Sequence, residues 1–112
     1  MERFTVTVQF PDGTTRTFDA GANEYILDAA RRAGIELPSL CERGWCTTCA
    51  VRVLEGTVDQ TDSLRFYPED AEAGFALPCT GKPRSDLRLL THQTAAMRQH
   101  RDAHHLPVPR GT

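Results

Sequence analysis

Residues 41–49 read Cys-Glu-Arg-Gly-Trp-Cys-Thr-Thr-Cys, and a fourth cysteine stands at position 79. The resulting spacing, C-x4-C-x2-C-x29-C, is the strongest signal in the sequence. Three thiolates that one short loop brings together, with a fourth from a distant segment, can surround a small inorganic core with four sulfur ligands. The spacing therefore indicates a metal or iron–sulfur centre held by Cys41, Cys46, Cys49 and Cys79.

Two other uses of four cysteines fit this pattern less well. Zinc modules usually present two C-x2-C knuckles, and only Cys46 to Cys49 has that form here. A pair of disulfides needs an oxidising compartment, which nothing in the sequence indicates, and leaves the glycine in the loop unexplained. A structural zinc ion and a disulfide framework thus stay open as weaker alternatives.

The sequence around the cysteine loop predicts several strands and one main helix. The helix is expected over residues 24–33, because Asn23 is a good N-cap and Gly34 suits the C′ position. On its outer face, Asp28 and Arg32 are spaced for an ion pair. Alternating apolar and polar residues mark expected strands at residues 3–10 and 50–54, a β-prone run marks another at 14–18, and residues 87–90 are the last strand candidate. This order predicts an α+β fold in which a mixed sheet grips one helix.

Length and composition narrow the function classes. The chain has 112 residues, enough for one domain, and a formal net charge of −2. No broad cationic surface is expected for nucleic acid or anionic lipid. The apolar runs are short and the first residues begin directly in a strand pattern, so we expect no membrane insertion and no signal or transit peptide. A short helix is possible after Pro68 and another around residues 95–97.

With the cysteine spacing in view, residues 3–93 resemble the plant-type (chloroplast and cyanobacterial) 2Fe-2S ferredoxin family. The likeness extends beyond the cysteines. Residues 24–30 (Glu-Tyr-Ile-Leu-Asp-Ala-Ala) are similar to the family's helix, and Leu37-Pro38 to its entry into the cluster loop. Residues 72–77 (Glu-Ala-Gly-Phe-Ala-Leu) are similar to its approach to the last ligand, and Thr91-His92 to the end of its closing strand. The resemblance implies a β-grasp fold (ubiquitin-like roll) with a mixed sheet, one main helix and a cluster-binding loop.

The resemblance also implies a soluble one-electron carrier with a single 2Fe-2S cluster, at a potential of about −400 mV. It assigns Cys41 and Cys46 to the iron nearer the surface and Cys49 and Cys79 to the deeper iron. Amide groups around Gly44 are expected to face the sulfurs and stabilise the added charge. No acid–base pair or nucleophile constellation is found, so no enzymatic activity is expected. A redox sensor or regulatory binding module is the alternative function.

Several positions depart from the family's usual pattern. Leu40 stands where a serine is common, and Glu42 places a negative charge near the cluster, with Arg43 only partly offsetting it. Both changes disfavour reduction, so we expect a potential below that of an ordinary photosynthetic ferredoxin. Cations or neutral residues replace acidic or aromatic ones at several further positions, which indicates different redox partners and a specialised ferredoxin: Arg31, Arg32, Arg65 and Thr94-Ala95.

The remaining expectations concern partners and the end of the chain. Trp45, Arg65 and Phe66 are candidate docking residues for a reductase or an electron-accepting enzyme. The ferredoxin domain is expected over residues 1–95, followed by a mobile C-terminal extension over 96–112. Its histidines, His100, His104 and His105, are spaced for weak metal binding only if the segment is helical. We expect a monomer in the cytoplasm of a bacterial, and by resemblance cyanobacterial, cell.

Overall fold

The protein is described by a computed structural model, which covers residues 2–37, 49–63 and 66–104. Three helices and seven strands form in this part of the chain. In chain order they are β1 (Arg3–Gln9), β2 (Thr15–Gly21), α1 (Ile26–Arg32), β3 (Val51–Glu55), β4 (Val58–Asp59), α2 (Pro68–Glu72), β5 (Phe75–Ala76), β6 (Lys82–Pro83), β7 (Leu87–Leu90) and α3 (Thr94–Ala103). None of the helices within these ranges has the length and apolar character that crossing a bilayer requires.

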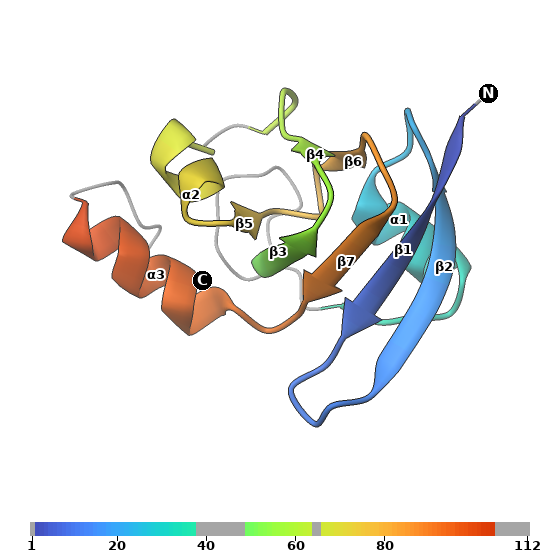
Figure 1. Cartoon of the computed structure of the whole chain (residues 1–112), viewed down its shortest axis with the longest axis horizontal. Helices are drawn as coiled ribbons and strands as arrows, with labels where there is room; N and C mark the ends of the chain where they lie inside the picture. The colour runs from blue at the N-terminus through green and yellow to red at the C-terminus, as the bar shows by residue number, and fades with distance from the viewer. Residues whose placement is uncertain (1, 38–48, 64–65, 105–112) are drawn as a thin grey trace.

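Five strands form one mixed sheet in the order β2-β1-β7-β3-β5 (Figure 1). β1 and β7 are parallel, with Val6 opposite Leu87, and the other neighbours are antiparallel. β4 and β6 form a separate two-stranded sheet. The predicted α+β fold with a mixed sheet is therefore confirmed, and the four strands expected from the sequence correspond to β1, β2, β3 and β7. The two-residue strands β4, β5 and β6 were not predicted, since they are too short to show a period.

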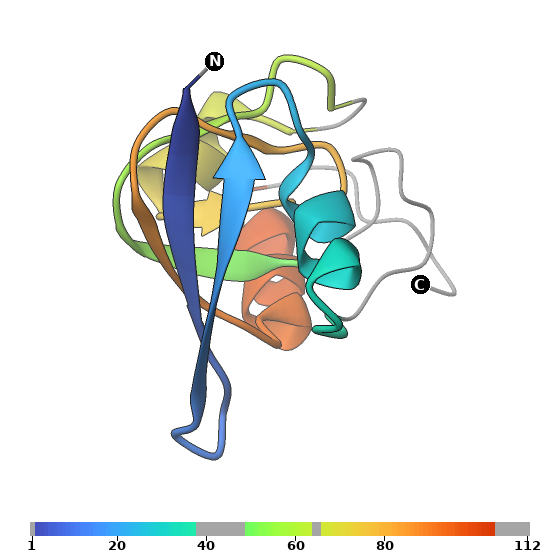
Figure 2. The ribbon, with the colours of Figure 1, turned by 90° about the vertical axis from the view of Figure 1, so that its right-hand side faces the viewer.

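α1 is the helix that the sheet grips, and Figure 2 shows it beside the β1–β2 hairpin. The predicted start was wrong, because the first helical residue is Ile26 and the N-cap is Tyr25, without a side-chain cap. The backbone N–H groups of Ile26 and Leu27 instead donate to the carbonyl oxygens of Gly81 and Pro78, both at 2.9 Å. Tertiary contacts thus satisfy the groups that a capping side chain would otherwise satisfy. The predicted end is confirmed, since Gly34 takes a φ of 78° after the C-cap.

One apolar core joins α1 to the inner face of the sheet. Directly paired residues share a face, so Val53 and Leu89 lie on one face of the sheet, and Arg52 and Phe75 lie on the other. The Phe75 ring packs on His100 of α3, with ring centroids 5.5 Å apart. α3 thus covers the second face of the sheet at its β3–β5 end.

The segment after β7 contains the helix that the sequence allowed around residues 95–97, and this helix is longer than expected. Residues 94–103 form α3, the longest helix described, which packs beside α2 (Figure 1). Met97 and Arg101 of α3 are wholly buried. Burial of an arginine has no periodic signature in the sequence, and its partner, Asp70, is 31 residues away. A domain boundary at residue 95 stays a prediction, as does the mobility of the end of the chain, because residues 105–112 lie outside the described residues.

Candidate metal centre

Two of the four cysteines meet beneath the end of the sheet. Cys49 lies two residues before β3, and Cys79 lies three residues after β5. β3 and β5 pair antiparallel with Val51 opposite Ala76, so the chain leading into one strand and the chain leaving the other are side by side. The Sγ atoms of Cys49 and Cys79 are 3.3 Å apart, and these residues are only 2% and 4% exposed. The sheet therefore holds two sulfur atoms, 30 residues apart in sequence, at one buried point.

The turn that carries Cys79 is fixed by the start of α1. The two carbonyl groups bound by the helix, those of Pro78 and Gly81, stand on either side of Cys79. A Cβ atom on Gly81 would lie 2.8 Å from Val58 Cγ1 and 2.9 Å from the Leu77 oxygen, so only glycine fits there without a shift. The helix, the β4–β6 sheet and the cysteine turn are thereby packed as one unit.

A line of polar side chains runs from β4 to the same cysteine. Gln60 is fixed by Leu77, whose N–H donates to Oε1 at 2.6 Å and whose carbonyl accepts from Nε2 at 3.3 Å. Gln60 Nε2 also donates to Ser63 Oγ at 2.7 Å, and Ser63 Oγ lies 2.7 Å from Thr80 Oγ1. Thr80 Oγ1 in turn is 3.9 Å from Cys79 Sγ. A connected series of polar groups thus reaches the buried sulfur from the side of the β4 loop.

A charged cluster lies on the surface beside the same turn. Asp62 accepts a hydrogen bond from the Tyr25 hydroxyl at 2.8 Å and pairs with Lys82 Nζ at 2.9 Å. The Lys82 contact, followed by the Tyr25 hydrogen bond, lowers the pKa of Asp62. The same carboxylate raises the pKa of Lys82 and, through its hydrogen bond, that of Tyr25. Lys82 is therefore a partly neutralised cation rather than an isolated positive charge near the site.

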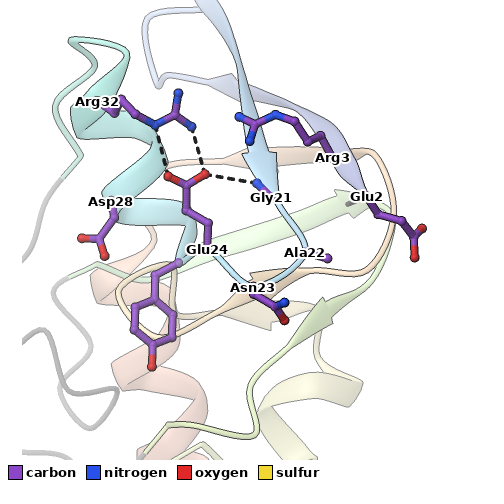
Figure 3. Close-up of a pocket in the computed structure, with 9 residues that line it drawn as sticks. Glu2, Arg3, Gly21, Ala22, Asn23, Glu24, Asp28 and Arg32 are labelled. Atoms are coloured by element: carbon purple, nitrogen blue, oxygen red, sulfur yellow. Dashed lines mark hydrogen bonds and ion pairs between the residues drawn. The ribbon is translucent and has the colours of Figure 1, made fainter.

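A shallow hollow lies beside the start of α1 and carries charges of both signs (Figure 3). Arg32 makes two hydrogen bonds to Glu24, Nη2 to Oε1 at 2.9 Å and Nε to Oε2 at 3.1 Å. These bonds, together with one from the Gly21 N–H, lower the pKa of Glu24. The predicted Asp28–Arg32 pair is wrong, because Glu24 lies in the turn before α1 and takes the guanidinium. Among the described residues, those that line the hollow include no cysteine and none from the turn that carries Cys79.

The structure places only part of the predicted site. Cys41 and Cys46 lie outside the described residues, as do Leu40, Glu42, Arg43, Gly44 and the docking candidates Trp45 and Arg65. Phe66 is half-buried and packs against the core, which leaves only part of its ring for a partner. Gln60, Ser63 and Thr80 were not among the site residues predicted from the sequence. Adjacency to Cys79 was the one signal that could have marked Thr80, whereas Gln60 and Ser63 stand in a polar segment without a period.

The histidines of α3 do not form a metal site with the residues around them. His100 and His104 have ring centroids 4.5 Å apart, as expected for a helical i, i+4 pair. His100 Nε2, however, faces Asp70 Oδ1 at 3.4 Å, and its ring lies on Phe75. Over residues 2–37, 49–63 and 66–104, no three metal-ligating side chains come together. His105 lies outside these ranges.

Known proteins decide between the possible centres. A family model described as a 2Fe-2S iron–sulfur cluster binding domain matches residues 9–84. The chain belongs to this family. Ferredoxin-2 of a Synechococcus species is 47% identical over 81 residues, which are 72% of this chain and 77% of that protein. The vegetative ferredoxin of Trichormus variabilis is 42% identical over 77 residues, 69% and 78% of the two chains.

A solved structure agrees with these relatives. The crystal structure of pectocin M2 superposes with a TM-score of 0.68 at 30% identity, and it covers 81% of this chain. This chain spans about a third of that protein, since the match covers 34% of it. The matching fold is therefore one part of a longer chain in that protein.

Membership in the family establishes the cofactor, a 2Fe-2S cluster, and confirms the resemblance and the β-grasp fold. The residues present fit this group: two buried sulfur donors 3.3 Å apart offer the soft ligands that iron–sulfur clusters take. The curated relatives are ferredoxins, which carry electrons and are not enzymes. This ferredoxin is accordingly an electron-transfer protein that exchanges electrons with redox partners.

Proposed function

We propose that this ferredoxin holds a single 2Fe-2S cluster with Cys41, Cys46, Cys49 and Cys79, and that it serves as a specialised low-potential carrier. The observation that carries the ligand set is the pair of buried sulfurs at the end of β3 and β5, 3.3 Å apart. The family's ligand spacing supplies Cys41 and Cys46 from the loop. When bound, the cluster accepts and releases one electron with its charge spread over iron and sulfur.

This chain's own residues hold and insulate that centre. Cys49 and Cys79 bind on the buried side, where water is excluded, and Cys41 and Cys46 bind on the side of the loop. The carbonyl groups of Pro78 and Gly81 accept hydrogen bonds from the start of α1, and these bonds hold the turn that carries Cys79 in place. A rigid ligand turn favours fast transfer, because the protein rearranges little when the charge changes.

The specialised role is supported by the charges near the site. Arg31 and Arg32 are exposed on α1, at positions where the resemblance to the family leads us to expect acidic residues, and Glu24 neutralises part of the Arg32 charge. Leu40 and Glu42 disfavour reduction, which places the proposed potential below that of photosynthetic carriers. The proposed partners are a reductase and electron-accepting enzymes that dock at Trp45, Arg65 and the exposed part of Phe66. We further propose that the protein is a monomer and that it lies in the bacterial cytoplasm; the cyanobacterial relatives support the location.

Substitution of the cysteines one at a time tests the ligand set. Each of the four changes to alanine is expected to abolish the visible absorption of the cluster after reconstitution with iron and sulfide. A Thr17→Val variant on the exposed side of β2 controls for handling and is expected to retain the spectrum. A cysteine variant that keeps the full spectrum would remove that residue from the set.

Exchange with a reductase tests the role as a carrier. We expect fast reversible electron transfer between the reductase and the unchanged protein. In Trp45→Ala this transfer should be slower, while the cluster spectrum stays unchanged. Slow cycling combined with a redox-dependent affinity for another protein would favour a sensor instead. Turnover with a photosynthetic ferredoxin–NADP reductase equal to that of an ordinary ferredoxin would contradict the specialised role.

A further inference from the structure

The polar line Gln60–Ser63–Thr80 ends on a sulfur atom, and its direction follows from the groups that compose it. Gln60 Oε1 accepts the Leu77 N–H, so the other atom of the amide, Nε2, must be the nitrogen. An amide nitrogen only donates, and Ser63 Oγ is therefore an acceptor in its contact with Gln60. The Ser63 hydroxyl proton does not take part in that bond and can be donated to another acceptor.

The only acceptor that the described residues offer this proton is Thr80 Oγ1, at 2.7 Å. The 2.7 Å contact allows Ser63 to donate to Thr80, and in that direction the Thr80 proton is free for another acceptor. Within the described part of the chain, Cys79 Sγ at 3.9 Å is the contact that remains for it. Sulfur is a large atom whose contacts are longer than those of oxygen, and a metal-bound thiolate accepts without donating. The arrangement that satisfies every hydroxyl group thus runs from Gln60 to the sulfur.

Packing holds this line in place. Thr80 is 6% exposed, and Gln60 and Ser63 are both partly buried. A Cβ atom at Gly81 would stand 3.2 Å from Gln60 Oε1, so the glycine makes room for the amide. Burial also strengthens the effect of a hydroxyl dipole on a nearby charge, because little water is present to screen it.

We propose that the Thr80 hydroxyl donates a hydrogen bond to the sulfur of Cys79 and raises the reduction potential of the cluster, with Ser63 and Gln60 as positioning residues. The inference rests on the proposed role of Cys79 as a ligand. Reduction adds negative charge to the cluster and its thiolates, so a donor stabilises the reduced state more than the oxidised state. The hydrogen bonds of Gln60, Ser63 and Thr80 thus offset part of the lowering of the reduction potential that is expected from Leu40 and Glu42.

The test is a potentiometric titration of the purified holoprotein and four variants. Thr80→Val keeps the branched shape and removes the hydroxyl, and its equilibrium constant for reduction is expected to fall about threefold. For a one-electron couple this fall corresponds to a potential lower by about 30 mV. Ser63→Ala should lower the constant less, whereas Thr80→Ser should stay close to the unchanged protein. Thr61→Val, in the same loop, removes a hydroxyl that binds Asp59 and should leave the potential unchanged.

A second readout separates a hydrogen bond from a change of shape. In deuterated buffer, the Fe–S stretching bands of the unchanged protein should shift, and part of that shift should vanish in Thr80→Val. A Thr80→Val potential within 10 mV of the unchanged protein, with intact absorption, would refute the hydrogen bond while leaving the ligand set in place. An equal fall in Thr61→Val would also refute it. Retention of the full cluster spectrum by Cys79→Ala would refute the ligand assignment itself.

Discussion

The buried ion pair between α2 and α3 gives the sharpest prediction on stability. Asp70 and Arg101 are both 0% exposed, with Arg101 Nη2 at 3.1 Å from Asp70 Oδ2. The same carboxylate accepts the Tyr67 N–H at the start of α2, at 3.0 Å. The Arg101→Met change keeps most of the side-chain volume and removes the charge. The change leaves the Asp70 carboxylate buried without the guanidinium group that pairs with it.

The expected cost follows from the burial of both partners. Removal of one member of a buried ion pair destabilises a protein by about 3–5 kcal/mol, because the other charge stays out of water. Typical domains are stable by only about 5–15 kcal/mol, so the loss is a large fraction of the total. For a domain of this size, each kcal/mol lowers the unfolding midpoint by about 3–5 °C. We therefore expect the midpoint to fall by about 10–20 °C.

The assay follows thermal unfolding by far-UV circular dichroism and cluster absorption together, at one fixed heating rate. Gln99→Met is the matched control, since it introduces the same side chain at an exposed position of α3 and should change the midpoint little. The double variant Asp70→Leu/Arg101→Met removes both charges and should recover part of the loss. A fall of less than about 3 °C in Arg101→Met would show that α3 adds little to the domain.

Three further predictions concern the turns, the surface cluster and the cofactor. Gly56 (φ 97°) and Gly13 (φ 90°) both have a φ in the left-handed region. A Cβ atom added at Gly56 would lie 2.8 Å from the Leu87 side chain and would also clash with the Asp86 carbonyl oxygen, whereas a Cβ atom added at Gly13 would meet no other atom within 4 Å. In urea titrations, Gly13→Ala should therefore lower the free energy of unfolding by about 1–2 kcal/mol, and Gly56→Ala should lower it by about 1–3 kcal/mol more. Equal losses in the two variants would contradict the close packing around Gly56. The Asp62 hydrogen bond raises the pKa of Tyr25, so its stabilising effect is present at neutral pH and is lost as pH rises through that raised value. Phenolate absorption should show the Tyr25 transition moving to lower pH in Asp62→Ala, which removes the acceptor, and an unmoved transition would contradict the hydrogen bond. Removal of the cluster by a chelator should lower the unfolding midpoint, since bound groups stabilise only the folded state; an unchanged midpoint would mean that the fold does not depend on it.

The long strands and the position of the site could be predicted because each has a local signature. Alternation of apolar residues marked β1, and Gly34 marked the end of α1. Pro68 indicated a short helix, which is confirmed as α2. The cysteine spacing placed Cys49 and Cys79 in one site, and their sulfur atoms do meet.

The features that could not be predicted depend on contacts between distant segments. The start of α1 is set by the carbonyls of Pro78 and Gly81, more than 50 positions along the chain, so Asn23 was the wrong cap. The line from Gln60 to Thr80 is made of common polar residues whose meaning appears only when the turn brings them to a sulfur. The packing of α3 likewise includes a buried arginine, Arg101, whose burial no periodic pattern in the sequence indicates.

The most direct test of the central claim is a potentiometric titration of the purified protein followed by electron paramagnetic resonance. A single 2Fe-2S carrier predicts that a signal from one unpaired electron per chain appears on reduction and disappears on reoxidation. The titration should follow a one-electron curve with a midpoint below about −400 mV, the usual value for plant-type ferredoxins. A colourless zinc-containing protein without a signal, or a centre that cannot be reduced reversibly, would contradict the claim.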